Sequence, residues 1–137
     1  MLFGRKPKNR KIVAHLGAHK TATSLVQKYF KEKQKYYKRK GVHFITRSDI
    51  SPYISWGQEI VRDPSLLANG IAEQTKGSNA GVILFSNENA LGKPLQKRPG
   101  LYPGAKEIIP AIAKSLRNYD VRIAYTIRPQ WEFLESY

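Results

Sequence analysis

The stretch KIVAHLGAHKTATSLVQ, residues 11–27, decides how the rest of the chain is interpreted. Its first part, KIVAHL, predicts a buried strand. A loop with Gly17 and three hydroxyl side chains follows, and it leads into an amphipathic, basic segment that predicts a helix. A helix that begins after such a loop directs free backbone N–H groups and the positive end of its dipole toward the loop. The local chemistry therefore predicts that this loop binds a phosphate or sulfate group.

The remainder of the chain predicts an α/β domain. Two runs, GVILFS (81–86) and VRIAYTI (121–127), are typical of buried parallel strands, and GVHFIT (41–46) is a shorter one. Helical patterns cover 22–39, 54–76 and about 105–118, with Gly41 as a stop, Asp63-Pro64 opening a second helix and Pro110 as a kink. This order predicts a P-loop-like, three-layer fold in which helices flank a central, mostly parallel sheet.

Length and charge limit the organisation and the partners. The 137 residues suit one domain, at 11–137, after a basic tail at 1–10. A new helix is predicted from Pro129 without a stop signal, so we expect this chain to be the front part of a longer protein. The net charge of +14 favours anionic partners. With no cysteine, signal peptide or membrane span, we expect a soluble, cytoplasmic protein.

The usual loop of ATP- and GTP-hydrolysing enzymes does not fit this stretch. Their pattern, G-x-x-x-x-G-K-[ST], needs a second glycine and a Gly-Lys-Ser/Thr end, and neither follows Gly17. An aspartate for Mg²⁺ is also missing after the strand that ends in FSNE (85–88). Local chemistry alone leaves an ordinary strand–turn–helix open as an alternative.

The loop resembles the 5′-phosphosulfate-binding loop of the PAPS-dependent sulfotransferases, especially the bacterial and carbohydrate-type members. Ala22 stands where that family more often has glycine. The resemblance implies that Lys20 neutralises the leaving oxygen, while Thr21, Thr23 and Ser24 bind the 5′-phosphate. The positions that match the family pattern H-x-G-x-H-K-T-G-T-[TS], with a later glutamine, are His15, Gly17, His19, Lys20, Thr21, Thr23, Ser24 and Gln27.

Two later segments are similar to the same family, in the right order. IRPQWEFLES (127–136) resembles its 3′-phosphate-binding element, which implies that Arg128 and Ser136 hold the 3′-phosphate. A planar guanidinium suits that task because it can bind phosphate through two parallel hydrogen bonds. SNENALG (86–92) resembles the strand end that supplies the acceptor-activating carboxylate, which implies this role for Glu88. His19 and His15 are rival candidates for the base. Residues 49–80 show no resemblance.

The resemblance implies a sulfotransferase that moves a sulfonate group from PAPS to a hydroxyl or amine of an acceptor, leaving PAP. The expected partners are this nucleotide donor and a small-molecule or glycan acceptor, with no metal and no nucleic acid. Two alternatives stay open. One is a P-loop-like nucleotide kinase, supported by the same strand–loop–helix. The other is a non-catalytic module that binds nucleic acid or another polyanion, supported by tyrosines among the lysines of KYFKEKQKYYKRK (28–40).

Overall fold

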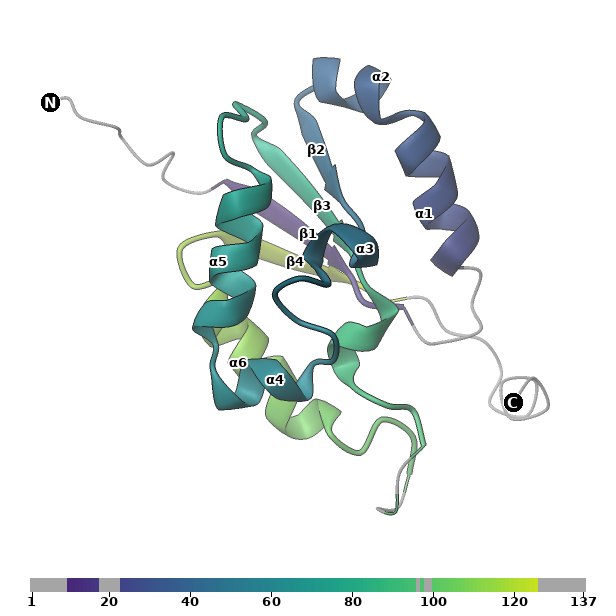
Figure 1. The fold of residues 1–137 in the computed structure, drawn as a ribbon, viewed down its shortest axis with the longest axis vertical. Coiled ribbons are helices and arrows are strands. Elements are labelled where there is room, and N and C mark those ends of the chain that lie inside the picture. Colours follow the sequence, from purple (N-terminus) through teal and green to yellow (C-terminus); the bar gives the residue numbers. More distant parts are fainter. Residues whose placement is uncertain (1–9, 18–22, 96, 98–99, 126–137) are drawn as a thin grey trace, which may run out of the picture.

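A parallel four-stranded sheet forms the centre of the molecule (Figure 1). The structure is a computed structural model that describes residues 10–17, 23–95, 97 and 100–125. The strands lie in the order β2-β3-β1-β4. Their bounds are Lys11–His15 for β1, Val42–Ile45 for β2, Val82–Ser86 for β3 and Asp120–Ala124 for β4. The predicted α/β class and the predicted strands at these four places are confirmed.

Helices cover both faces of the sheet. One face is covered by α1 and α2 and the other by α4, α5 and α6, as Figure 1 shows. Right-handed crossovers explain this division. The chain moves across the sheet in one direction from β1 to β2, and in the opposite direction from β2 to β3 and from β3 to β4, so the first connection lies on one face and the later two on the other. The bounds are Thr23–Glu32 (α1), Gln34–Arg39 (α2), Arg47–Ile50 (α3), Gln58–Arg62 (α4), Ser65–Gln74 (α5), Glu88–Leu91 (the 3-10 turn η1) and Ala105–Ser115 (α6).

The main hydrophobic core lies between the sheet and the second group of helices. Ile12 of β1 and Ile83 of β3 are paired in register and fully buried, and Ile71 of α5 and Ile108 of α6 belong to the same cluster. Complete burial of one such side chain is worth roughly 1.5–3 kcal/mol. No buried residue of this cluster comes from α1 or α2. The first two helices are therefore held mainly by other contacts.

The helix predicted over 22–39 is divided at Lys33 into α1 and α2. Lys33 has φ −100° and ψ 11°, outside the helical range. The change of direction lets Tyr37 approach Phe30, with ring centroids 5.1 Å apart, and Phe30 in turn contacts Phe44 of β2 at 5.2 Å. After α2, Gly41 has φ +83°, so the predicted glycine stop is confirmed.

Two helix starts depend on local capping. Asp63 accepts a hydrogen bond from the backbone N–H of Ser65 at 3.1 Å, which confirms the predicted start of α5. The single turn α3 was not predicted, and it is stabilised by a capping box in which Thr46 and Asp49 bind each other's backbone N–H groups. Pro110 lies inside α6, which continues through it to Ser115.

The strand β4 is less buried than its sequence predicts. Among the described residues it pairs with β1 alone, and Ile123 is 53% exposed. The prediction of a buried strand is therefore wrong for the described part of 121–127, because an apolar run cannot show whether its strand has a neighbour on each side. The described residues form no helix that is long and apolar enough to cross a membrane.

Candidate functional site

Polar side chains meet where β1 and β3 end. His15 and Ser86 are the last residues of these two strands and are paired in register. Both are buried, and Nδ1 of His15 lies 2.9 Å from Oγ of Ser86. Ligands of open parallel sheets bind at the carboxyl ends of the strands, so this edge is where a site is expected.

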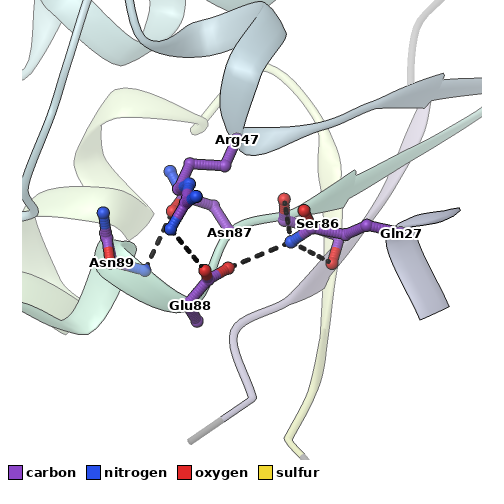
Figure 2. A network of polar contacts seen from close by, with 6 residues as sticks. All are labelled: Gln27, Arg47, Ser86, Asn87, Glu88 and Asn89. Atoms are coloured by element: carbon purple, nitrogen blue, oxygen red, sulfur yellow. Dashed lines mark hydrogen bonds and ion pairs between the residues drawn. The ribbon is translucent and has the colours of Figure 1, made fainter. Parts of the chain in front are cut away.

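Glu88 occupies the centre of this cluster, in η1 directly after β3 (Figure 2). Glu88 is 8% exposed. One carboxylate oxygen, Oε1, accepts a hydrogen bond from Nη1 of Arg47 at 2.6 Å, and the other, Oε2, accepts one from Nε2 of Gln27 at 3.0 Å. Figure 2 shows that these partners approach the carboxylate from two sides. Charge-assisted hydrogen bonds of this kind compensate the cost of burying a carboxylate.

Two segments that are distant from Glu88 in sequence hold its carboxylate. Gln27 comes from α1, and its amide also reaches Oγ and the backbone oxygen of Ser86, both at 3.4 Å. Arg47 is the first residue of α3, immediately after the Thr46 cap, and its side chain is 48% exposed. The ion pair therefore has one buried and one solvent-facing partner. Neither Arg47 nor Ser86 was predicted as a site residue, and Gln27 was seen only as part of the loop pattern.

Asn87 attaches the turn that carries Glu88. Its backbone N–H donates to the carbonyl oxygen of His15 at 3.0 Å, and its side-chain oxygen accepts the N–H of Asn89 at 2.9 Å. The residue is 1% exposed, and its Nδ2 is buried without a hydrogen-bond partner among the described residues. A buried amide donor without a partner is uncommon. Asn87 therefore offers a free donor beside Glu88.

The pKa of His15 is lowered from its usual value, mainly because burial disfavours the charged ring, and the negative charge of Glu88 offsets part of this effect. His15 is therefore neutral at pH 7 and acts as a hydrogen-bonding group at the end of β1. A neutral ring can accept a proton, but the lowered pKa makes it a weaker base and its Nδ1 is already paired with Ser86, which favours a structural role over that of rival base. The second rival, His19, lies outside the described residues.

The phosphate loop is described only at its two ends. Gly17 is buried directly after β1, and α1 begins at Thr23. Thr23 and Ser24 form the start of α1, and their side chains lie outside the described part, as do His19, Lys20, Thr21 and Ala22 entirely. The first turn of α1 has no acidic residue, which keeps the positive end of its dipole uncompensated. The anion site predicted for this loop stays a prediction.

The predicted 3′-phosphate element also extends beyond the described residues. Arg128 and Ser136 both lie outside them. Their strand, β4, pairs in parallel with β1 from Lys11↔Asp120 to His15↔Ala124, and the N–H of Leu16 donates to the carbonyl oxygen of Ala124 at 3.0 Å. The two segments that carry the predicted phosphate-binding residues thus run side by side toward the same edge of the sheet.

Comparison of the chain with protein-family models, with curated proteins and with solved structures finds no match. Among residues 10–17, 23–95, 97 and 100–125 there is no group of three or more His, Asp or Glu side chains placed to hold a metal ion.

Acidification is expected to destabilise the fold through His15 and His43. Burial lowers the pKa of both rings, and nearby Lys38 and Arg10 lower that of His43 further, with Asp49 opposing. Because the unfolded chain then binds more protons below pH 6.5, stability is complete above that pH and declines as the pH falls toward the folded pKa values. Urea unfolding at pH 7.5 and 5.5 should show a lower free energy of unfolding at the acidic pH.

The double variant His15→Gln, His43→Gln serves as the control for this effect. It should show a smaller loss between the two pH values, because most carboxylates titrate below this range. An equal loss in the double variant and the wild type would contradict the assignment to the two histidines.

Proposed function

We propose that this chain carries the donor-binding and base-bearing part of a sulfotransferase, which moves a sulfonate group from PAPS to a hydroxyl or amine of a carbohydrate acceptor. The observation that supports this best is the position of Glu88. Its buried, doubly hydrogen-bonded carboxylate lies at the carboxyl edge of β3, beside the end of β1 that leads into the phosphate-type loop. An ionised carboxylate next to an anion-binding loop is the arrangement that base-assisted group transfer requires.

The role proposed for Glu88 is to accept the proton of the acceptor hydroxyl. As the acceptor oxygen forms its bond to sulfur, the bond between sulfur and the bridging phosphate oxygen breaks, and PAP leaves with that electron pair. Among the described residues, each carboxylate oxygen accepts one hydrogen bond, which leaves lone pairs for the acceptor. Arg47 and Gln27 orient the carboxylate, and the buried Nδ2 donor of Asn87 would pair with an enclosed water.

The donor is proposed to bind across the ends of β1 and β4. The start of α1 and Gly17 supply the 5′-phosphate site, with Lys20 at the leaving oxygen, and Arg128 and Ser136 supply the 3′-phosphate site. The parallel pairing of β1 and β4 supports this division, because it brings both segments toward one edge. A donor with phosphate at both ends of its nucleoside suits two such sites. The P-loop-like character of the fold is part of this proposal.

Calorimetric titration with PAP, and with AMP and ATP as controls, tests the proposal. We expect PAP to bind more than about tenfold more tightly than AMP, because each charge-assisted contact to the 3′-phosphate is worth roughly 1.5–3 kcal/mol. Sulfonate transfer should also persist in EDTA. Equal affinity for PAP and AMP would contradict the proposal, and a requirement for Mg²⁺ with ATP bound more tightly than PAP would favour the kinase alternative.

A further inference from the structure

A basic surface covers α1 and α2, on the face of the sheet that lacks the main core. The helix α2 has no buried residue at all. Residues 23–40 contain a single acid, Glu32. The same segment contains seven exposed basic residues, Lys28, Lys31, Lys33, Lys35, Lys38, Arg39 and Lys40. A short helix that has no fully buried residue and concentrates one sign of charge is typical of a surface that contacts an anionic partner.

Two hollows flank α2, and Lys38 lines both of them. The first, of about 290 Å³, lies between α2 and β2 and is lined also by Lys35. The second, of about 350 Å³, lies between the end of α2 and the loop at 77–80, and is lined also by Arg39. Lys35, Lys38 and Arg39, with these two hollows, are called the α2 face below. Cations on the walls of a hollow attract anions more strongly than cations on a convex surface do, because the field is focused there.

One residue that lines the first hollow, His43, has a buried ring nitrogen without a hydrogen-bond partner among the described residues. This nitrogen is Nδ1. His43 lines the hollow together with Lys35 and Lys38. A buried ring nitrogen that is left without a partner costs free energy unless a ligand or a bound water satisfies it. This atom adds a hydrogen-bonding group to a site whose other features are positive charges.

We propose that the α2 face binds an anionic polysaccharide. The aromatic rings nearby are about half exposed, but each also contacts another ring, which leaves less of their surface for base stacking. Tyr36 packs edge-on against Tyr37 at 84°, and the ammonium group of Lys40 lies over the Tyr36 ring, 5.7 Å from its centroid. Tyr29 packs edge-on against Phe30 at 82°. The most exposed groups of this face are the cations Lys35, Lys38 and Arg39, which suit sulfate and carboxylate groups on a sugar chain.

The position of the α2 face relative to Glu88 suits an extended polymer. The loop at 77–80 precedes β3, whereas Glu88 follows it, so the α2 face and the candidate site lie toward opposite ends of the sheet. They are connected by α1, whose ten residues span about 15 Å and whose Gln27 contacts Glu88. The choice of a polysaccharide rests in part on the proposed function, because the same chain would then present its hydroxyl groups to Glu88.

Binding of a heparin octasaccharide to two charge-matched triple variants tests the inference. The first is Lys35→Ser, Lys38→Ser, Arg39→Ser on the α2 face. The second is Lys106→Ser, Lys114→Ser, Arg117→Ser, three exposed residues in and just after α6, which lies across the sheet. The net charge falls by three in both. We expect the first variant to lose at least about tenfold in affinity at 0.15 M salt and the second less than about twofold. Thermal unfolding should show that both variants remain folded.

Two other outcomes would contradict the inference. Equal losses in the two variants would show that only the overall charge attracts the polymer. Tighter binding of a uridine 15-mer than of the octasaccharide, with the same dependence on the α2 face, would show that the partner is a nucleic acid. Titration of the wild type with PAP keeps the two proposals apart. A chain that binds PAP without heparin contradicts only this inference, and one that binds heparin without PAP contradicts only the proposed function.

Discussion

Glu88→Gln is expected to lower kcat for sulfonate transfer by about 10²–10⁴-fold, or roughly 3–5 kcal/mol of transition-state stabilisation. The amide is almost the same size as the carboxylate but cannot accept the acceptor's proton. It also places an NH₂ group where Arg47 or Gln27 now donates a hydrogen bond. The measurement is the initial rate of transfer of labelled sulfonate from PAPS to chemically desulfated heparin. The affinity for PAP should stay within about threefold, because Glu88 is not among the residues proposed to hold the donor.

Arg47→Met separates the base role from a purely structural role. The substitution removes the arginine of the Arg47–Glu88 ion pair and keeps the carboxylate of Glu88. If Glu88 is the base, Arg47→Met should lose much less activity than Glu88→Gln, because the carboxylate can still accept a proton and loses only one of the two groups that orient it. If Glu88 serves only as a partner for Arg47, the two variants should lose similar activity and similar stability. Comparable losses of kcat in both would therefore contradict the base assignment.

Gly57→Ala is expected to destabilise the fold by about 3 kcal/mol and to lower Tm by roughly 10 °C. A Cβ atom added to Gly57 would lie 1.8 Å from the carbonyl oxygen of Ala90, a backbone atom that cannot rotate away. Gly57 also donates its N–H to the carbonyl oxygen of Asn89 at 3.1 Å. Both carbonyl groups belong to η1, the turn that carries Glu88. The substitution should therefore move this turn and reduce transfer activity as well, which calorimetry and the rate assay together would show.

Gly81→Ala is the matched control. An added Cβ at Gly81 meets nothing within 4 Å, and its φ is not in the left-handed region. The same change in composition should then leave Tm unchanged or raise it slightly, because alanine reduces the entropy of the unfolded chain. A Gly57→Ala protein that melts within about 2 °C of Gly81→Ala would contradict the close packing of Gly57 against η1.

Local signals in the sequence predicted the class of the fold and several boundaries. The apolar runs at 11–16, 81–86 and 121–127 predicted the places of β1, β3 and β4, because backbone pairing favours β-branched residues wherever a strand is half or fully buried. Gly41 and Asp63 marked a helix end and a helix start, because left-handed φ and N-terminal capping depend on the residue itself. The sequence also predicts Glu88 as the candidate base.

The surroundings of Glu88 depend on the tertiary structure. Gln27, Arg47 and Glu88 are separated by 20 and 41 positions, and they meet because β1, β2 and β3 run in parallel and end at one edge of the sheet. The burial of each strand is likewise undetermined by sequence, since an apolar run has the same letters at the edge of a sheet as in its middle, and β1 is the one neighbour of β4 in the part of the chain that the structure describes. Sequence alone therefore determined which chemical groups the chain offers and which local structures it forms. Only the packing of distant elements decided that Arg47 and Gln27 hold the buried carboxylate of Glu88. The physical reason is that hydrogen bonds between side chains depend on position in space rather than on spacing along the chain.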